Sequence, residues 1–191
     1  SGYAISGGKL FTLGTRGDDL MVIAVDISTG EEAWSTKIAT DNQQGYNVGW
    51  GHGPRGTPTV SDGKVYALGP KGTLACVNAE DGKKEWDKDI SSMSGTAGKW
   101  GYSESPLVDG DVVVVSPGGS RDSIVAFDKN SGSKEWSTDV DGVNQAEYAT
   151  ILVAELDGKR QYVKFFDSVI AGVEAGSGDL LWTGSWHGLS L

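Results

Sequence analysis

Four stretches of the chain stack without gaps and decide the fold: AVDISTGEEAW (24–34), CVNAEDGKKEW (76–86), AFDKNSGSKEW (126–136) and GVEAGSGDLLW (172–182). Each has a small and an apolar residue, an acid or amide, three turn-forming residues, a glycine and, four positions after it, a tryptophan. The tryptophans recur at intervals of about 50 residues, which is typical of a repeat architecture. The residues that define the repeat are Asp26, Gly30, Trp34, Gly82, Trp86, Asp128, Gly132, Trp136, Gly178 and Trp182.

Each repeat has the pattern of four β-strands. In the second repeat, β-rich runs at 56–60, 64–68, 73–78 and 83–90 are separated by turns that contain Asp-Gly or Pro-Lys-Gly. Such turns connect antiparallel strands, and no stretch shows sustained helical periodicity. The sequence therefore predicts an all-β propeller of four-stranded antiparallel blades. We expect about four blades, near 1–40, 41–92, 93–141 and 142–186, in a single region that spans 1–191.

The recurring residues have a structural interpretation in such a blade. Glycine supplies a turn position with positive φ, and the acid or amide four residues before it can accept backbone N–H groups of the same turn. Tryptophan offers a large flat surface for packing between neighbouring sheets. We therefore expect the four repeated tryptophans to be structural and not to bind a ligand.

Composition excludes several classes of partner and site. The chain has 26 Asp and Glu against 16 Lys and Arg, a net charge of −10, which makes nucleic acid and anionic membranes poor partners. No run approaches 18 apolar residues, so no transmembrane segment is predicted, and no signal peptide is visible at the N-terminus. The only histidines, His52 and His187, lack ligand spacing, and we predict no metal site.

The repeat resembles the tryptophan-docking motif of the β-propellers related to pyrroloquinoline quinone (PQQ) enzymes. Residues 24–34 match its pattern Ala-x-Asp-x-x-Thr-Gly-x-x-x-Trp in full. That superfamily includes quinoprotein alcohol dehydrogenase-like enzymes and non-enzymatic BamB-like proteins. GHGPRGTPTV (51–60) and WGYSESPLV (100–108) are further similar to the exported PQQ-like repeat proteins of planctomycete-type bacteria. The resemblance implies a bacterial propeller that is periplasmic or otherwise exported, but a shared fold does not specify an activity.

The resemblance also implies a larger ring, because members of the superfamily usually close with about seven or eight blades. The first blade is expected to be incomplete, since residues 2–8 align only with the end of 57–63. We therefore expect a partial or half propeller whose uncovered sheets favour self-association that completes a ring. A closed four-bladed monomer is the alternative.

Two functions remain open. We favour a non-catalytic binding or scaffold module that acts outside the cytoplasm, binds a protein or small-molecule ligand and needs no cofactor. The alternative is a fragment of a PQQ-dependent alcohol or sugar dehydrogenase, for which the resemblance implies PQQ, calcium, a vicinal disulfide and a catalytic aspartate. The chain has one cysteine, Cys76, which cannot form that disulfide, and no aspartate matches the catalytic one. No catalytic residue is therefore predicted.

A binding site is expected where the chain leads into the innermost strand of each blade. These segments line the central channel and one face of a propeller. We predict that their polar and aromatic residues form a funnel for a small ligand or an extended peptide. The residues are His52, Arg55, Trp100, Tyr102, Glu104, Glu147 and Tyr148, of which His52, Arg55 and Glu104 are the first candidates. Ordinary turn chemistry is the alternative interpretation.

Overall fold

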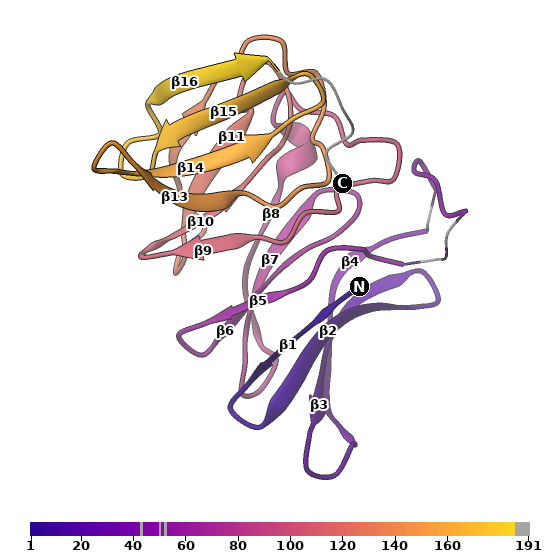
Figure 1. Cartoon of the computed structure of the whole chain (residues 1–191). Helices are drawn as coiled ribbons and strands as arrows, with labels where there is room; N and C mark the ends of the chain where they lie inside the picture. The colour runs from indigo at the N-terminus through magenta and orange to yellow at the C-terminus, as the bar shows by residue number, and fades with distance from the viewer. Residues whose placement is uncertain (43, 50, 52, 186–191) are drawn as a thin grey trace.

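The structure is a computed structural model and describes residues 1–42, 44–49, 51 and 53–185. Among these residues, sixteen strands form four antiparallel sheets of four strands each, which confirms the predicted fold class (Figure 1). The strands are β1 (Tyr3–Ser6), β2 (Lys9–Arg16), β3 (Asp19–Asp26) and β4 (Glu32–Thr40); β5 (Thr59–Ser61), β6 (Lys64–Leu68), β7 (Thr73–Asn78) and β8 (Lys84–Asp89); β9 (Leu107–Asp109), β10 (Val112–Val115), β11 (Ile124–Asp128) and β12 (Lys134–Thr138); and β13 (Leu152–Leu156), β14 (Lys159–Phe165), β15 (Val169–Glu174) and β16 (Leu180–Ser185).

The sheets follow one another in chain order, from the indigo first sheet to the orange and yellow last one (Figure 1). Within each sheet the strands pair in sequence, so that β1, β5, β9 and β13 start their sheets, and β1 contacts β5, which contacts β9. One turn of 3-10 helix, η1 (Ile90–Ser92), is the only helical segment in the described part of the chain. No helix in that part is therefore long and apolar enough to span a membrane.

The first sheet is complete in its strands, although the sequence suggested an incomplete first blade. β1 contains four residues and pairs with β2 from Tyr3 to Ser6. The corresponding strands β5 and β9 contain only three residues each. Residues 2–8 therefore suffice for the whole innermost strand, because only three residues of the aligned stretch 57–63 belong to β5.

Three apolar cores lie between successive sheets. Phe11 and Val22 of the first sheet pack with Val65 of the second, and Tyr66 and Val113 pack between the second and third sheets. A further core joins the third and fourth sheets and contains Val114, Ala126, Tyr162 and Val173. Because successive residues of a strand point to opposite faces, the inner two sheets need apolar residues at almost every position. This explains the run of four valines in β10.

The outer strands β4, β8 and β12 each send a tryptophan onto the turn of the next sheet. The indole N–H of Trp34 donates to the carbonyl oxygen of Ala79 at 3.3 Å, and that of Trp86 donates to the carbonyl of Lys129 at 3.1 Å. A Cβ atom on Gly82 would lie 2.6 Å from the ring of Trp34. A Cβ atom on Gly132 would similarly lie 2.8 Å from the ring of Trp86, and Gly178 lies under Trp136 in the same way. Only glycine permits this approach, and all three glycines have positive φ.

The acid or amide that begins each of these turns holds the turn closed. The Asp26 carboxylate accepts the backbone N–H of Ser28 at 2.8 Å, and Asp128 accepts that of Ser131 at 2.7 Å. Hydrogen bonds from the Ser28 hydroxyl and backbone lower the pKa of the Asp26 carboxyl. The Asp128 turn, which receives Trp86, is thus fixed by its own side chain.

Replacing Gly82 with alanine should destabilise the protein more than the same change at Gly63. Both glycines have positive φ, so each replacement costs about 1–2 kcal/mol in backbone strain. Gly63 has no atom near its added Cβ, whereas Gly82 lies under Trp34, which adds about 1–3 kcal/mol for overpacking. Urea unfolding of both variants measures the difference. Equal losses would show that the tryptophan contact does not constrain this position.

Candidate functional site

The segments that lead into β5, β9 and β13 contact one another through residues 47, 96, 97, 99 and 146. We call the surface that these three segments form the loop face. The backbone N–H of Asn47 donates to the carbonyl of Lys99 at 2.9 Å, and that of Ala146 donates to the carbonyl of Thr96 at 2.8 Å. Ala97 and Ala146 also form an isolated parallel bridge. Residues that are about 50 positions apart in the sequence therefore share one surface, as the repeat spacing implies.

Arg55 connects two of these segments. One terminal nitrogen of its guanidinium donates to the carbonyl oxygen of Trp100 at 3.1 Å, and the other donates to that of Asn47, also at 3.1 Å. The side chain is half-buried. Since two neutral carbonyl groups do not neutralise the guanidinium, Arg55 brings a positive charge to the loop face as well as holding it together.

Trp100 and Tyr148 form an aromatic pair beside Arg55. Their ring centroids are 5.2 Å apart at an interplanar angle of 55°, and the ammonium group of Lys99 lies 5.6 Å from the Trp100 ring. Burial raises the pKa of the Tyr148 hydroxyl. Both rings are only partly buried, whereas Lys99 is exposed. Two aromatic rings and two cations, those of Lys99 and Arg55, are therefore gathered on one surface.

Tyr102 and Glu104 lie inside the protein and not on the loop face. The Tyr102 hydroxyl donates to the carbonyl of Pro117 at 3.2 Å, and burial raises its pKa to about 12. The Glu104 side chain is 1% exposed. One of its oxygen atoms accepts the backbone N–H of Ser116, and the other accepts a hydrogen bond from the Lys164 ammonium at 2.8 Å. Glu104 therefore has both oxygen atoms bound within the protein.

The sequence analysis does not include Lys164, yet this residue forms a buried ion pair between the fourth sheet and Glu104 in the segment that leads into β9. Its ammonium group is fully buried, binds Glu104 and also donates to the carbonyl of Ala149. The signal in the sequence is its place in β14, where it shares the face of Tyr162, a core residue two positions earlier. A lysine at such a position requires a buried partner.

Glu147 is the remaining buried acid of the predicted set. Its side chain accepts a hydrogen bond from the Gln145 amide at 2.6 Å through one oxygen. The other oxygen has no hydrogen-bond partner among the described residues. His52 lies outside the described residues. The structure thus brings Arg55, Trp100 and Tyr148 together on the surface and places the other described candidates beneath it.

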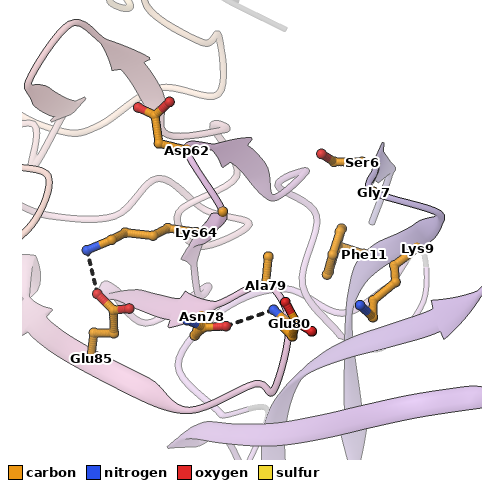
Figure 2. Close-up of a pocket in the computed structure, with 11 residues that line it drawn as sticks. Ser6, Gly7, Lys9, Phe11, Asp62, Lys64, Asn78, Ala79, Glu80 and Glu85 are labelled. Atoms are coloured by element: carbon orange, nitrogen blue, oxygen red, sulfur yellow. Dashed lines mark hydrogen bonds and ion pairs between the residues drawn. The ribbon is translucent and has the colours of Figure 1, made fainter.

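A polar groove of about 360 Å³ lies between the first and second sheets, away from the predicted residues (Figure 2). Lys64 forms an ion pair with Glu85 at 2.5 Å along one side, and the Asn78 side chain accepts the backbone N–H of Glu80 at 2.8 Å. Lys9 and Asp62 also line it. Because both signs of charge alternate along the groove, it favours neither an anion nor a cation.

The residue that follows the turn-closing acid or amide of a repeat lies at each of these sheet boundaries. Ala79 lines the groove between the first and second sheets, and Ala175 lines one of about 470 Å³ between the third and fourth. Between the second and third sheets the corresponding residue is Lys129. Its ammonium group crosses the boundary to Asp62 at 2.8 Å and also donates to the carbonyl of Gly110 in its own sheet at 2.7 Å. Alanine leaves the boundary open, whereas lysine bridges it.

Two observations concern the cofactor site that the dehydrogenase alternative implies. Within the described ranges, no three His, Cys, Asp or Glu side chains gather closely enough to hold a metal ion. Cys76 is buried, and burial raises the pKa of its thiol to about 12, which suppresses the reactive thiolate.

Comparison with known sequences identifies relatives of one kind. A family model described as "Outer membrane protein assembly factor BamB" matches residues 18–188. The protein of that name from Burkholderia pseudomallei is 29% identical over 145 residues, which cover 73% of this chain and 32% of the relative. The one from Escherichia coli is 28% identical over 118 residues, which cover 60% of this chain and 27% of the relative. The chain thus spans about a third or less of these curated relatives.

Comparison with solved structures supports the fold. BamB from Moraxella catarrhalis superposes with a TM-score of 0.68 at 16% identity, over 98% of this chain and 51% of that chain. Quinohemoprotein alcohol dehydrogenase from Comamonas testosteroni superposes with a TM-score of 0.70 at 17% identity, over 98% of this chain and 35% of that chain. Similarity at these identities establishes a shared propeller fold and no shared activity.

Replacing Lys164 with methionine should cost about 3–5 kcal/mol of stability, because it leaves Glu104 charged and buried without its partner. Combining Lys164→Met with Glu104→Gln should recover much of that loss, since the double variant buries no charge. Urea unfolding of the single and double variants gives the coupling between the two residues. Additive losses would mean that the two side chains do not interact in the folded protein.

Proposed function

The chain belongs to the family of the outer membrane protein assembly factor BamB, and we propose from this that it is a non-catalytic propeller module that binds polypeptides. The observation that carries the proposal is the family match, which covers residues 18–188. The relatives' name describes assembly of outer membrane proteins, so we propose an exported, periplasmic module that contacts such proteins or the factors that assemble them.

The loop face is the surface that we propose for this contact. Trp100 and Tyr148 offer partly exposed aromatic rings, and Arg55 and Lys99 add two cations beside them. Tryptophan, tyrosine and arginine contribute most often to the binding energy of protein interfaces. Glu147, Tyr102 and Glu104 lie beneath this surface and support it, and we propose that they shape the face without touching the partner.

The cations on the loop face differ in sign from the protein as a whole, which carries a net charge of −10. This contrast favours a polypeptide that has apolar or aromatic residues next to an acidic one. The rings of Trp100 and Tyr148 would pack against the apolar residues, and Lys99 and Arg55 would form ion pairs with the carboxylate. An extended segment of an unfolded β-barrel protein, with its alternating side chains, has this chemistry.

Removing the exposed part of the loop face should weaken binding of an unfolded polypeptide. The probe is a fluorescently labelled eight-stranded outer-membrane β-barrel protein, diluted from urea and titrated by anisotropy. Tyr148→Ala and Lys99→Ala should each raise the dissociation constant about tenfold or more, as expected when a central contact is lost. Lys83→Ala is the matched control, since Lys83 is exposed in a turn of the second sheet, outside the loop face.

Thermal melting of each variant separates lost binding from lost folding. If Tyr148→Ala and Lys99→Ala melt like the parent chain and bind the probe equally well, the loop face is not the binding surface. If the parent chain itself does not bind the unfolded β-barrel protein, the proposed function is contradicted.

An oxidation assay separates the proposed function from the dehydrogenase alternative. Because the chain's one cysteine is buried and cannot form the vicinal disulfide, we expect that addition of PQQ with calcium will neither raise the melting temperature nor yield oxidation of an alcohol coupled to a redox dye. A quinoprotein alcohol dehydrogenase assayed in parallel is the positive control. Dye reduction that depends on both PQQ and this chain would favour the alternative.

A further inference from the structure

The groove between the third and fourth sheets carries an excess of acids. It has a volume of about 470 Å³, which is within the range of sites that admit a side chain or a small molecule. Asp109, at the end of β9, is one of its lining residues, so the groove lies at the end of the strands opposite to the loop face. The described residues that line it include the acids Asp109, Asp111 and Glu135 and one cation, Arg160.

Arg160 is already engaged by one of these acids. Its Nε atom donates to one oxygen of the Asp109 carboxylate at 2.9 Å, and its Nη2 atom donates to the other at 2.7 Å. The hydroxyl of Tyr162, a residue that is 1% exposed, donates to the same carboxylate at 2.9 Å. The hydrogen bond from Arg160 is the largest cause that lowers the pKa of Asp109. The charges of Asp109 and Arg160 therefore neutralise each other within the wall of the groove.

Glu135 is the acid of the groove that has no cation. The ammonium group of Lys129 lies 3.6 Å from the Asp111 carboxylate, but no ion pair among the described residues includes Glu135. The adjacent Lys134 binds Asp122 instead. Because Glu135 is exposed as well, its carboxylate can pair with a cation that comes from outside the chain.

The same repeat position in the second sheet holds an acid that is paired. Glu85 and Glu135 each precede the docking tryptophan of their repeat, and the Glu85 carboxylate binds the Lys64 ammonium at 2.5 Å. Both members of this pair border the groove between the first and second sheets, but Lys64 shares the strand face of Tyr66, which packs against the third sheet. The pair therefore fills the boundary between the second and third sheets.

The third sheet lacks the lysine that would pair with Glu135. Lys64 lies opposite Asn78, the turn-closing residue of its repeat. In the third sheet Val112 lies opposite the turn-closing Asp128, so it holds the place of that lysine. Val112 also lines the groove and packs against the core between the third and fourth sheets. Valine thus replaces the lysine, whereas the acid is retained.

A second lysine of the filled boundary is absent here too. Lys129 reaches from the third sheet to Asp62 of the second, and Ala175 occupies its repeat position in the fourth sheet. The groove therefore lacks both lysine side chains that occupy the neighbouring boundary. Gly110 and Gly176 also line it, and a Cβ atom on either would have no neighbour within 4 Å. A polypeptide backbone can approach closely at such glycines.

We propose that this groove binds a lysine side chain of an extended polypeptide, whose ammonium group pairs with Glu135 as Lys64 pairs with Glu85. The methylene groups of the bound lysine would contact Val112 and Ala175, since long charged side chains bury their stems along apolar surface. The net charge of −10 attracts a basic segment to the protein. The site is separate from the loop face, which presents cations at the other end of the strands.

An NMR titration with a blocked peptide tests the proposal. The probe is acetyl-Gly-Thr-Lys-Thr-Gly-amide, and the reporter is the indole N–H resonance of Trp136, which lines the groove and is assigned with Trp136→Phe. The peptide should shift this resonance saturably and leave those of Trp34 and Trp86 in place. The same peptide with norleucine, which has no ammonium group, should not shift it. No shift with the lysine peptide would overturn the proposed site.

Butylamine distinguishes a free amine from a polypeptide. It has the stem and the ammonium group of lysine but no backbone, so it should shift the Trp136 resonance only at higher concentrations than the peptide. If butylamine and the peptide bind equally well, the groove takes an amine and the polypeptide is overturned as its ligand.

Two substitutions test the pairing with Glu135. Glu135→Gln should raise the dissociation constant of the peptide about tenfold or more, because an amide forms no ion pair. Glu80→Gln is the matched control, since Glu80 is an exposed acid that lines the groove between the first and second sheets. Val112→Lys should abolish binding by placing an internal lysine beside Glu135.

Thermal melting confirms that each variant is folded, and Glu135→Gln tests the proposal by itself, because Glu135 is exposed and its replacement should not affect folding. If Glu135→Gln and Glu80→Gln bind the peptide as the parent chain does, the pairing is overturned. None of these readouts depends on whether the loop face binds a polypeptide.

Discussion

The packing of a tryptophan ring on the glycine turn of the next sheet is the constraint on which the fold depends. It fixes the distance between neighbouring sheets, because only a residue without a Cβ atom allows the ring to approach. It also satisfies the indole N–H through a backbone carbonyl of the next sheet, at Ala79 and at Lys129. With the spacing set, apolar side chains from both sheets can fill the space between them.

The fold could be predicted because this constraint leaves a local signature. Acid, glycine and tryptophan lie within one short stretch, so a single repeat displays the turn and the docking ring together. The strands follow from the turns on either side. The repeat does not fix where an innermost strand begins, so the prediction of an incomplete first blade is wrong: β1 is formed by the four residues from Tyr3 to Ser6.

The site was harder to anticipate because burial depends on partners that are distant in the sequence. Glu104 and Lys164 are 60 positions apart, and neither residue by itself indicates an ion pair. Arg55 and Trp100 could be placed on one surface, since both lie in segments that lead into an innermost strand. Whether a side chain in such a segment points outward, as Tyr148 does, or inward, as Tyr102 does, is decided by packing that no repeat pattern encodes.

The residues at positions 79, 129 and 175 line or bridge the grooves between sheets without taking part in tryptophan docking through their side chains. The residue that opens or bridges each groove follows the turn-closing residue, and tryptophan docking uses only its backbone carbonyl at 79 and 129. Its side chain is thus free to vary while the stack of sheets stays intact. A propeller of this kind can acquire a different set of peripheral grooves by single substitutions, one sheet boundary at a time, without rebuilding its core.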